Sequence, residues 1–188
     1  MACTLLVTSL LAAAASVEAG DPPAAPKQVI GEATGDLDGD GVPDRVQLLQ
    51  GDDTDVDLAI YLSAAGKPAD RPSLYKPAFG WADMTGAERP ALKITPKGSL
   101  IVEFRNDPGR DRWRQQFTIA VRNNALMVAG YSYESRDALD PKAGGGCDVN
   151  LLTGTGTRNL KPVKLAAGGV PVAGWSDASI PPPCRFDE

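Results

Sequence analysis

Residues 112–134 read RWRQQFTIAVRNNALMVAGYSYE, and this stretch decides the fold. Its first half, up to Arg122, alternates side chains between two faces, which predicts a strand. Asn123-Asn124 can take positive φ at both centres of a two-residue hairpin turn, so Ala125–Glu134 is predicted to return as the partner strand. The register then pairs three sets of core-facing residues: Val121 with Leu126, Ile119 with Val128, and Phe117 with Gly130.

The neighbouring chain also indicates strands joined by turns. Residues 99–105 alternate in the same way, and Pro108-Gly109 marks the tip of the turn that follows. Loops are predicted for 63–91, with a helical turn near 81–86, and for 136–146. We therefore expect a mainly β fold, an antiparallel meander or sandwich with long loops in one small domain. The other strands are predicted at 28–34, 45–50, 56–62, 147–152 and 157–165, before a Pro-rich coil.

The composition limits the catalytic groups and metal ligands that the chain can offer. The chain has 188 residues, no histidine and a formal net charge of −5. Without histidine, Ser-His-Asp and Cys-His nucleophiles and His-liganded zinc or haem are excluded. No basic footprint for nucleic acid stands out. Any bound metal is expected to be a hard cation with oxygen ligands.

The N-terminal segment is predicted to be an export signal. Residues 1–19 contain an apolar run too short to span a bilayer, followed by Val17 and Ala19 at the small-residue positions of a cleavage site. The alternative is an N-terminal helix of the mature fold. Residues 20–27 are expected to be a flexible lead-in and 28–188 a single β-rich domain without a membrane span. The mature protein is expected in the periplasm or outside the cell.

Two cysteines remain after the predicted signal, Cys147 and Cys184. An exported protein meets an oxidising environment, which favours a disulfide between them. That bond would tie the Pro-rich C-terminal segment to the domain. The alternative is two buried free thiols.

The strongest motif is the loop DLDGDGVPD at residues 36–44. Carboxylates recur at its positions one, three, five and nine, and Gly41 supplies a sharp turn at position six. A tight loop with this spacing turns its oxygens towards one centre, which suits Ca²⁺. The alternative is a solvated acidic turn. The predicted metal ligands are Asp36, Asp38, Asp40, the carbonyl of Val42, and Asp44.

This loop resembles that of FG-GAP/VCBS repeats, the calcium loop of integrin α-type propellers. In that family the residues matching the five predicted ligands hold the ion. Position twelve is Gln47, where an EF-hand would carry Glu, so the loop does not resemble an EF-hand. A propeller carries several such loops and this chain has one.

A weaker resemblance covers roughly residues 30–155. The order runs from the Asp-rich loop through Gly98–Val102 and Arg112–Phe117 to Asp148–Gly154. It is similar to a group of exported bacterial proteins that carry one loop of this type and have no assigned activity. The resemblance implies calcium and export, and no reaction.

A candidate binding face follows from the predicted hairpin register. Arg114 would lie opposite Tyr133 and Gln116 opposite Tyr131, which mixes a cation, an amide and phenols on one rigid face. That face is either a binding surface or a layer covered by the 63–91 loop.

Other polar and aromatic clusters have two readings each. The arginines near 105–114 either meet an anionic glycan or acidic partner, or pair with neighbouring acids. The three tryptophans are either sugar-stacking platforms or core anchors. The acidic residues at 52–57 are either a solvated turn or a second cation site. The arginines are Arg105, Arg110, Arg112 and Arg114. The tryptophans are Trp81, Trp113 and Trp175, and the acidic residues are Asp52, Asp53, Asp55 and Asp57.

The sequence favours a non-enzymatic, exported, calcium-binding domain with a protein or glycan partner. One alternative is an inhibitor of an extracellular enzyme that inserts loop 63–91 or 106–111. A less favoured alternative is a secreted hydrolase with a carboxylate pair. Its candidate acids are Glu103, Glu134, Asp137 and Asp140.

Overall fold

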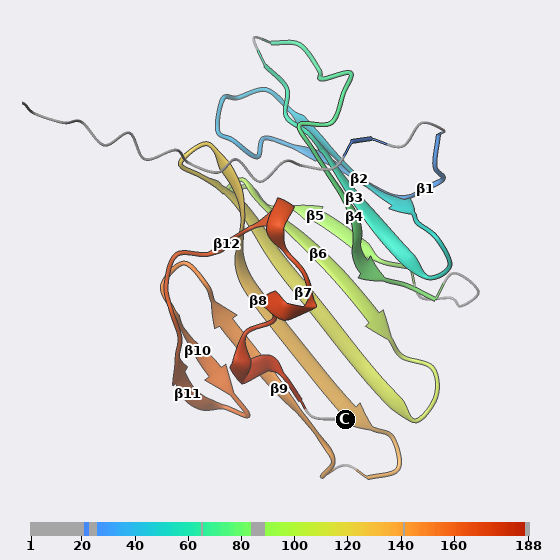
Figure 1. Ribbon diagram of the computed structural model, residues 1–188, viewed down its shortest axis with the longest axis vertical. Coiled ribbons are helices and arrows are strands. Elements are labelled where there is room, and N and C mark those ends of the chain that lie inside the picture. Colours follow the sequence, from blue (N-terminus) through green and yellow to red (C-terminus); the bar gives the residue numbers. More distant parts are fainter. Residues whose placement is uncertain (1–20, 23–25, 65, 84–88, 141, 187–188) are drawn as a thin grey trace, which may run out of the picture.

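The computed structural model describes residues 21–22, 26–64, 66–83, 89–140 and 142–186 (Figure 1). The predicted signal at 1–19 and half of the lead-in lie outside these ranges. The described chain forms strands and three short 3-10 helices. The strands are β1 (Val29–Gly35), β2 (Asp44–Gln50), β3 (Asp55–Tyr61), β4 (Leu74–Trp81), β5 (Ala91–Ile94), β6 (Ser99–Asn106), β7 (Asp111–Arg122), β8 (Ala125–Asp137), β9 (Gly144–Asn150), β10 (Thr155–Arg158), β11 (Lys161–Lys164) and β12 (Val170–Pro171). The helices are η1 (Val172–Gly174), η2 (Asp177–Ser179) and η3 (Pro182–Cys184).

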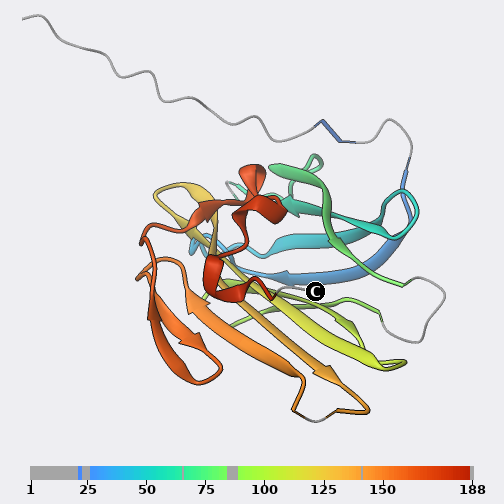
Figure 2. The same cartoon turned by 60° about the horizontal axis from the view of Figure 1, so that its bottom comes forward.

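The strands form two antiparallel sheets, which confirms the predicted mainly β class. One sheet has four strands in the order β1-β2-β3-β4. The other has eight, in the order β11-β10-β9-β8-β7-β6-β5 with β12 added beside β8. The small sheet and the C-terminal segment cover the same face of the large sheet (Figures 1 and 2). We call this covered face the inner face and the opposite one the outer face.

Close contacts between the sheets require glycine at two positions. A Cβ on Gly80 of β4 would lie 2.2 Å from Cζ of Phe104, and one on Gly35 of β1 would lie 2.8 Å from Cγ2 of Ile94. Phe117 sits at the centre of the shared core. Its ring centroid is 4.7 Å from that of Phe79 in β4 and 6.1 Å from that of Phe104 in β6.

The long hairpin forms as predicted near its turn and differs beyond it. Asn123 and Asn124 have φ of +51° and +60°, and Val121 and Ile119 pair with Leu126 and Val128 as expected. A register shift then follows between Thr118 and Ile119. The predicted pairing of Phe117 with Gly130 is therefore wrong, and Phe117 lies opposite Tyr131. A bulge of this kind is invisible to a strict period-two pattern.

Two loop predictions are also corrected. Residues 63–91 contain β4, where Pro77 and Gly80 obscure the alternation; because β4 is an edge strand, it tolerates a proline. The helical turn predicted near 81–86 falls partly outside the described residues, and Trp81 belongs to β4. Strands β8 and β9 extend into the predicted loop 136–146.

The strand predicted at 157–165 is a hairpin. Asn159 and Leu160 have φ of +48° and +65°, so they form the two-residue turn between β10 and β11.

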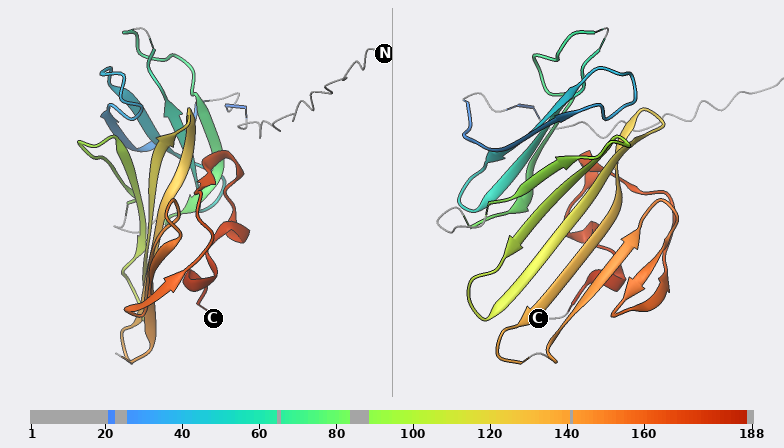
Figure 3. Two further views of the ribbon diagram at one scale, coloured as in Figure 1. Left: turned by 90° about the vertical axis from the view of Figure 1, so that its left-hand side faces the viewer. Right: turned by 180° about the vertical axis from the view of Figure 1, so that it is seen from behind.

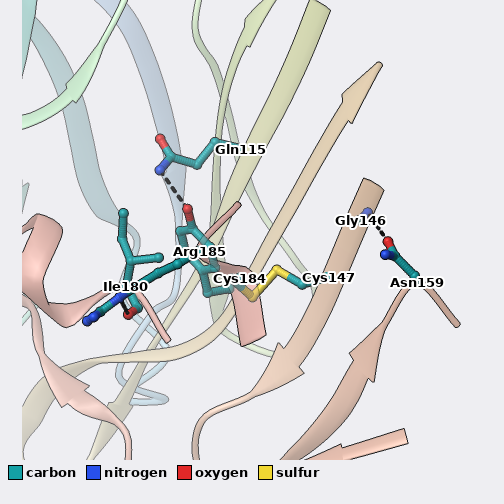
Figure 4. Close-up of a disulfide and its surroundings, with 8 residues drawn as sticks. Gln115, Gly146, Cys147, Asn159, Ile180, Cys184 and Arg185 are labelled. Carbon is teal, nitrogen blue, oxygen red and sulfur yellow. Dashed lines mark hydrogen bonds between the residues drawn. A yellow bond between two sulfur atoms is a disulfide. The ribbon is translucent and has the colours of Figure 1, made fainter. Parts of the chain in front are cut away.

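The C-terminal segment completes the core. Trp175 is buried between two rings of the large sheet, 5.3 Å from the centroid of Phe117 and 5.7 Å from that of Tyr131. Gln115 donates a hydrogen bond of 2.9 Å to the Tyr131 hydroxyl, and burial raises the pKa of Tyr131 to about 12. The Cys147–Cys184 disulfide then joins this segment to β9, as predicted (Figure 4).

One carboxylate of the acidic stretch 52–57 is buried. Asp57 accepts hydrogen bonds from Lys27 Nζ at 2.6 Å, from the Tyr75 hydroxyl, and from the Ala78 N–H at 3.0 Å. Burial would raise the pKa of Asp57, but these hydrogen bonds and the Lys27 charge lower it below its usual value. Asp57 lies at the register shift in the β3–β4 pairing. Because Asp57 is buried there, the solvated-turn interpretation is wrong for this residue.

We expect the double variant Cys147→Ser/Cys184→Ser to be less stable. The bond links residues separated by 37 positions, and the chain-entropy model gives about 3–4 kcal/mol for a loop of that size. Urea unfolding measures the loss. A reductant should destabilise the wild type by a similar amount and leave the variant unchanged; an equal effect of reductant on both would contradict this account.

Asp57→Ala is expected to lower the free energy of unfolding by about 2–3 kcal/mol at neutral pH, because the buried Tyr75 hydroxyl and the Lys27 ammonium lose their acceptor. The pKa of Asp57 is lowered in the folded state, so its stabilisation is complete above the usual carboxyl pKa of 3.8 and is lost as pH falls through the folded pKa. The difference from wild type in urea unfolding should therefore shrink in acid. The exposed Asp52→Ala control should change stability by under about 0.5 kcal/mol.

Candidate metal site

The Asp-rich loop connects β1 to β2, and its backbone conformation depends on two glycines. Gly39 and Gly41 have φ of +85° and +82°. Apart from its own chain neighbours, no described residue has an atom within 4 Å of a Cβ placed at either position, so space is not what requires glycine there. The requirement is the left-handed backbone, which residues with a Cβ adopt at a cost.

Hydrogen bonds within the loop orient its carboxylates. Asp36 accepts from the N–H groups of Gly39 and Gly41, at 2.7 and 3.0 Å. Asp38 accepts from the Asp40 N–H at 3.1 Å, and Asp40 accepts from the Val42 N–H at 2.7 Å. These bonds fold the loop tightly, as turns with Asp side chains do.

Three of the predicted ligands come together. Asp36, Asp38 and Asp40 each offer a carboxylate oxygen, and these oxygens lie within 4.8 Å of one another. Asp38 and Asp40 are exposed and Asp36 is half-buried, so solvent reaches the group. Burial raises the pKa of Asp38, and the negative charges of Asp44, Asp40 and Asp36 raise it further. A cation at the centre would relieve that repulsion.

Asp44 has a different role from the other three. It is buried, and its two oxygens accept hydrogen bonds from the N–H groups of Leu37 and Ser63, each at 2.7 Å. The Ser63 hydroxyl in turn donates to the Pro43 carbonyl at 2.7 Å. Asp44 therefore joins the loop to the chain after β3. Its role as a ligand, like that of the Val42 carbonyl, stays a prediction.

Two supports of the loop were not found from the sequence. Ser63 follows β3 and carries no motif. Gly98, with φ of +71°, lies in the β5–β6 turn, where a Cβ would be 3.1 Å from the Asp36 carbonyl oxygen. Leu37 buries its side chain in the core beneath the loop. Only the pairing of distant strands brings Ser63 and Gly98 to the loop.

Three of the four candidate acids of the hydrolase alternative lie within 4 Å of an arginine. Arg114 lies 3.9 Å from Glu103 and 3.6 Å from Glu134, and Arg110 lies 2.7 Å from Asp137. The N–H of Leu139 and the charge of Arg110 lower the pKa of Asp137. A general acid needs a raised pKa, so Asp137 does not suit that role.

The predicted binding face of Arg114, Gln116, Tyr131 and Tyr133 does not form. The register shift in the hairpin pairs Arg114 with Glu134 and Gln116 with Ser132. Tyr131 is buried on the inner face, and the ring of half-buried Tyr133 lies 5.6 Å from that of Phe186. Arg114 and Gln116 point to the outer face, because neighbouring side chains on a strand alternate.

Comparison with models of protein families gives no match, and comparisons with curated proteins and with solved structures give no significant match. Within the described residues, no helix has the length and apolar character needed to cross a membrane.

Replacing Asp44 and replacing Asp38 should have different effects in a chelator. Asp44→Ala leaves two backbone N–H groups without their buried acceptor, so we expect a loss of about 2–4 kcal/mol even without metal. Asp38→Ala removes an exposed charge from a repulsive group and should change stability by less than about 0.5 kcal/mol. Urea unfolding in EGTA measures both. Equal losses would contradict the division of roles.

Proposed function

We propose that this chain is an exported, calcium-stabilised β-domain that acts as a non-enzymatic binding module. The observation that carries the proposal is the group of three carboxylates within 4.8 Å of one another at the junction of β1 and β2. An ion bound by this group, between β1 and β2, would bind the folded chain only and would therefore stabilise it.

The donor chemistry supports calcium as the ion. The chain has no histidine, and Cys147 and Cys184 are consumed in a disulfide, so these two cysteines and imidazole are not available as soft or borderline ligands. Calcium accepts six to eight oxygens in flexible geometry, whereas magnesium demands a near-ideal octahedron. An open, glycine-containing loop that combines carboxylate and carbonyl oxygens suits calcium better.

The disulfide supports location in an oxidising compartment, the periplasm or the exterior. The predicted signal at residues 1–19 agrees with that location. Calcium is plentiful outside the cytoplasm, so a modest affinity suffices. The partner is a protein or a glycan, and the net charge of −5 argues against nucleic acid.

The inhibitor alternative has one supporting observation. The connection between β3 and β4 projects beyond both sheets (Figure 1), and a bridge between Ala64 and Lys67 shapes it. Inhibition of a panel of extracellular hydrolases, abolished by shortening this connection, would favour that function.

Saturating Ca²⁺ should raise the melting temperature relative to EGTA. At a hundredfold excess over Kd the stabilisation is about 2.7 kcal/mol, which corresponds to roughly 5–10 °C for a chain of this size. Mg²⁺ at the same concentration should give a smaller shift. Asp38→Asn/Asp40→Asn should abolish the response, and the exposed control Asp52→Asn should retain it. A melting temperature unaffected by chelation would contradict the proposed stabilisation by calcium.

A further inference from the structure

Residues 172–186 lie on the inner face of the large sheet without joining it as a strand. They lie beside the small sheet, and β7, β8 and β9 are in front of them when the domain is viewed from behind (Figures 1 and 3). The preceding strand, β12, pairs with β8. Beyond β12 the segment forms the short helices η1, η2 and η3 and pairs with none of the described strands.

Among the described residues, the hydrogen bonds of 172–186 all join two residues of this same segment. Backbone N–H groups close its three short helices, and the Arg185 guanidinium donates to the carbonyl oxygens of Ile180 and Ala178, at 2.9 and 2.8 Å. Prolines occupy positions 181–183, so three consecutive residues have no N–H to donate to a sheet. The segment therefore does not depend on the sheets for its hydrogen bonds.

Side-chain packing and one covalent bond hold the segment against the large sheet. Val172, Trp175 and Cys184 are 0%, 3% and 4% exposed. The Trp175 ring packs against rings of β7 and β8. The bond from Cys184 to Cys147 fastens the segment to β9 (Figure 4). The segment is thus held by β12 before its first residue and by the disulfide near its last described residue.

The disulfide has a large share in this attachment, because ordering each residue of the segment costs conformational entropy. Without the bond, that cost is offset by the packing of a few side chains, chiefly Val172 and Trp175. A segment with few buried apolar contacts opens locally at a smaller cost in free energy than the whole domain. We therefore expect the segment to open before the sheets do.

The two sheets have contacts of their own that do not involve this segment. The Phe79 ring of the small sheet lies 4.7 Å from Phe117 and 6.3 Å from Phe104 of the large sheet. Loss of Trp175 removes one ring partner of Phe117 and leaves three. The backbone pairing within each sheet is unaffected, so the sheets can stay packed when the segment leaves.

We propose that residues 172–186 form a redox-controlled strap, which a dithiol reductant releases from the inner face while both sheets stay folded. A thiolate of the reductant attacks one sulfur of the Cys147–Cys184 bond and forms a mixed disulfide. The second thiol of the reductant then displaces the remaining cysteine. Two electrons and two protons pass to the cysteines, and the reductant leaves as its own disulfide.

Burial of the bond and of the rings beneath the strap determines what reduction does. Cys147 and Cys184 are buried, so the reductant acts during brief local openings of the strap. Release then uncovers the rings of Phe117 and Tyr131, which Trp175 covers in the oxidised form. The strap lies on the large sheet and the Asp-rich loop on the small one, so this inference does not depend on calcium.

The test is hydrogen exchange with mass spectrometry on the full chain, oxidised and treated with dithiothreitol, below the melting temperature of both forms. Alkylation of Cys147 and Cys184 measures the reduction. Amide exchange in 172–186 should become at least about tenfold faster after reduction, because the strap then opens locally. Peptides from β6, β7 and β8 should keep their protection. An aromatic dye that binds exposed apolar surface, anilinonaphthalene sulfonate, should fluoresce more strongly with the reduced form.

The double variant Cys147→Ala/Cys184→Ala is the matched control. It lacks the bond without placing a hydroxyl in the core, so it should exchange and bind dye as the reduced wild type does, with or without dithiothreitol. Unchanged protection of 172–186 after complete reduction would show that packing alone holds the segment and would overturn the proposal. Simultaneous loss of protection in β6–β8, or a bond that dithiothreitol does not open in the folded chain, would overturn it as well.

Discussion

The packing around Phe117 is the interaction on which the rest of the structure depends. Its ring contacts rings from both sheets and from the C-terminal segment. Burying such rings supplies much of the free energy that holds separate layers together. The four partners are Phe79 of β4, Phe104 of β6, Tyr131 of β8 and Trp175. The register shift in the long hairpin is part of this packing, because it brings Tyr131 opposite Phe117.

That packing divides the large sheet into two unlike faces. The inner face is covered by the small sheet and by the C-terminal segment, which the disulfide secures. On the outer face of β7, the polar side chains of Arg114 and Gln116 point away from the core. The same alternation along β7 that buries Phe117 directs Arg114 outwards. The apolar core and the polar surface therefore use opposite sides of the same strand.

The Asp-rich loop combines residues of the core with residues that solvent reaches. Asp44 and Leu37 belong to the folded core, whereas Asp36, Asp38 and Asp40 face solvent within reach of one ion. Binding an ion there would draw in the ends of β1 and β2 and so reinforce the small sheet. A site built in this way is suited to stabilisation, since its outer carboxylates repel one another until a cation arrives.

Particular residues show which features could be predicted from the sequence. The alternation in Arg112–Arg122 and the pair Asn123-Asn124 were sufficient to predict the hairpin and its turn, because both signals are local. Cys147 and Cys184 were sufficient for the disulfide, since only two cysteines follow the predicted signal. The grouping of Asp36, Asp38 and Asp40 was also predictable from a local signal, because the three carboxylates lie close together within one nine-residue loop.

Other features required the tertiary structure. The bulge that moved Tyr131 into the core, the strand β4 with its proline, and the burial of Asp57 against Lys27 all depend on residues far apart in the chain. The pairing of Arg114 with Glu134 is of the same kind, since no local pattern determines the register of these two strands. The sequence by itself therefore determined the β class, the hairpin turn, the disulfide and the carboxylate group. Only the tertiary structure decided which side chains share a face, because a shift of one residue in a strand reverses the side to which every following side chain points.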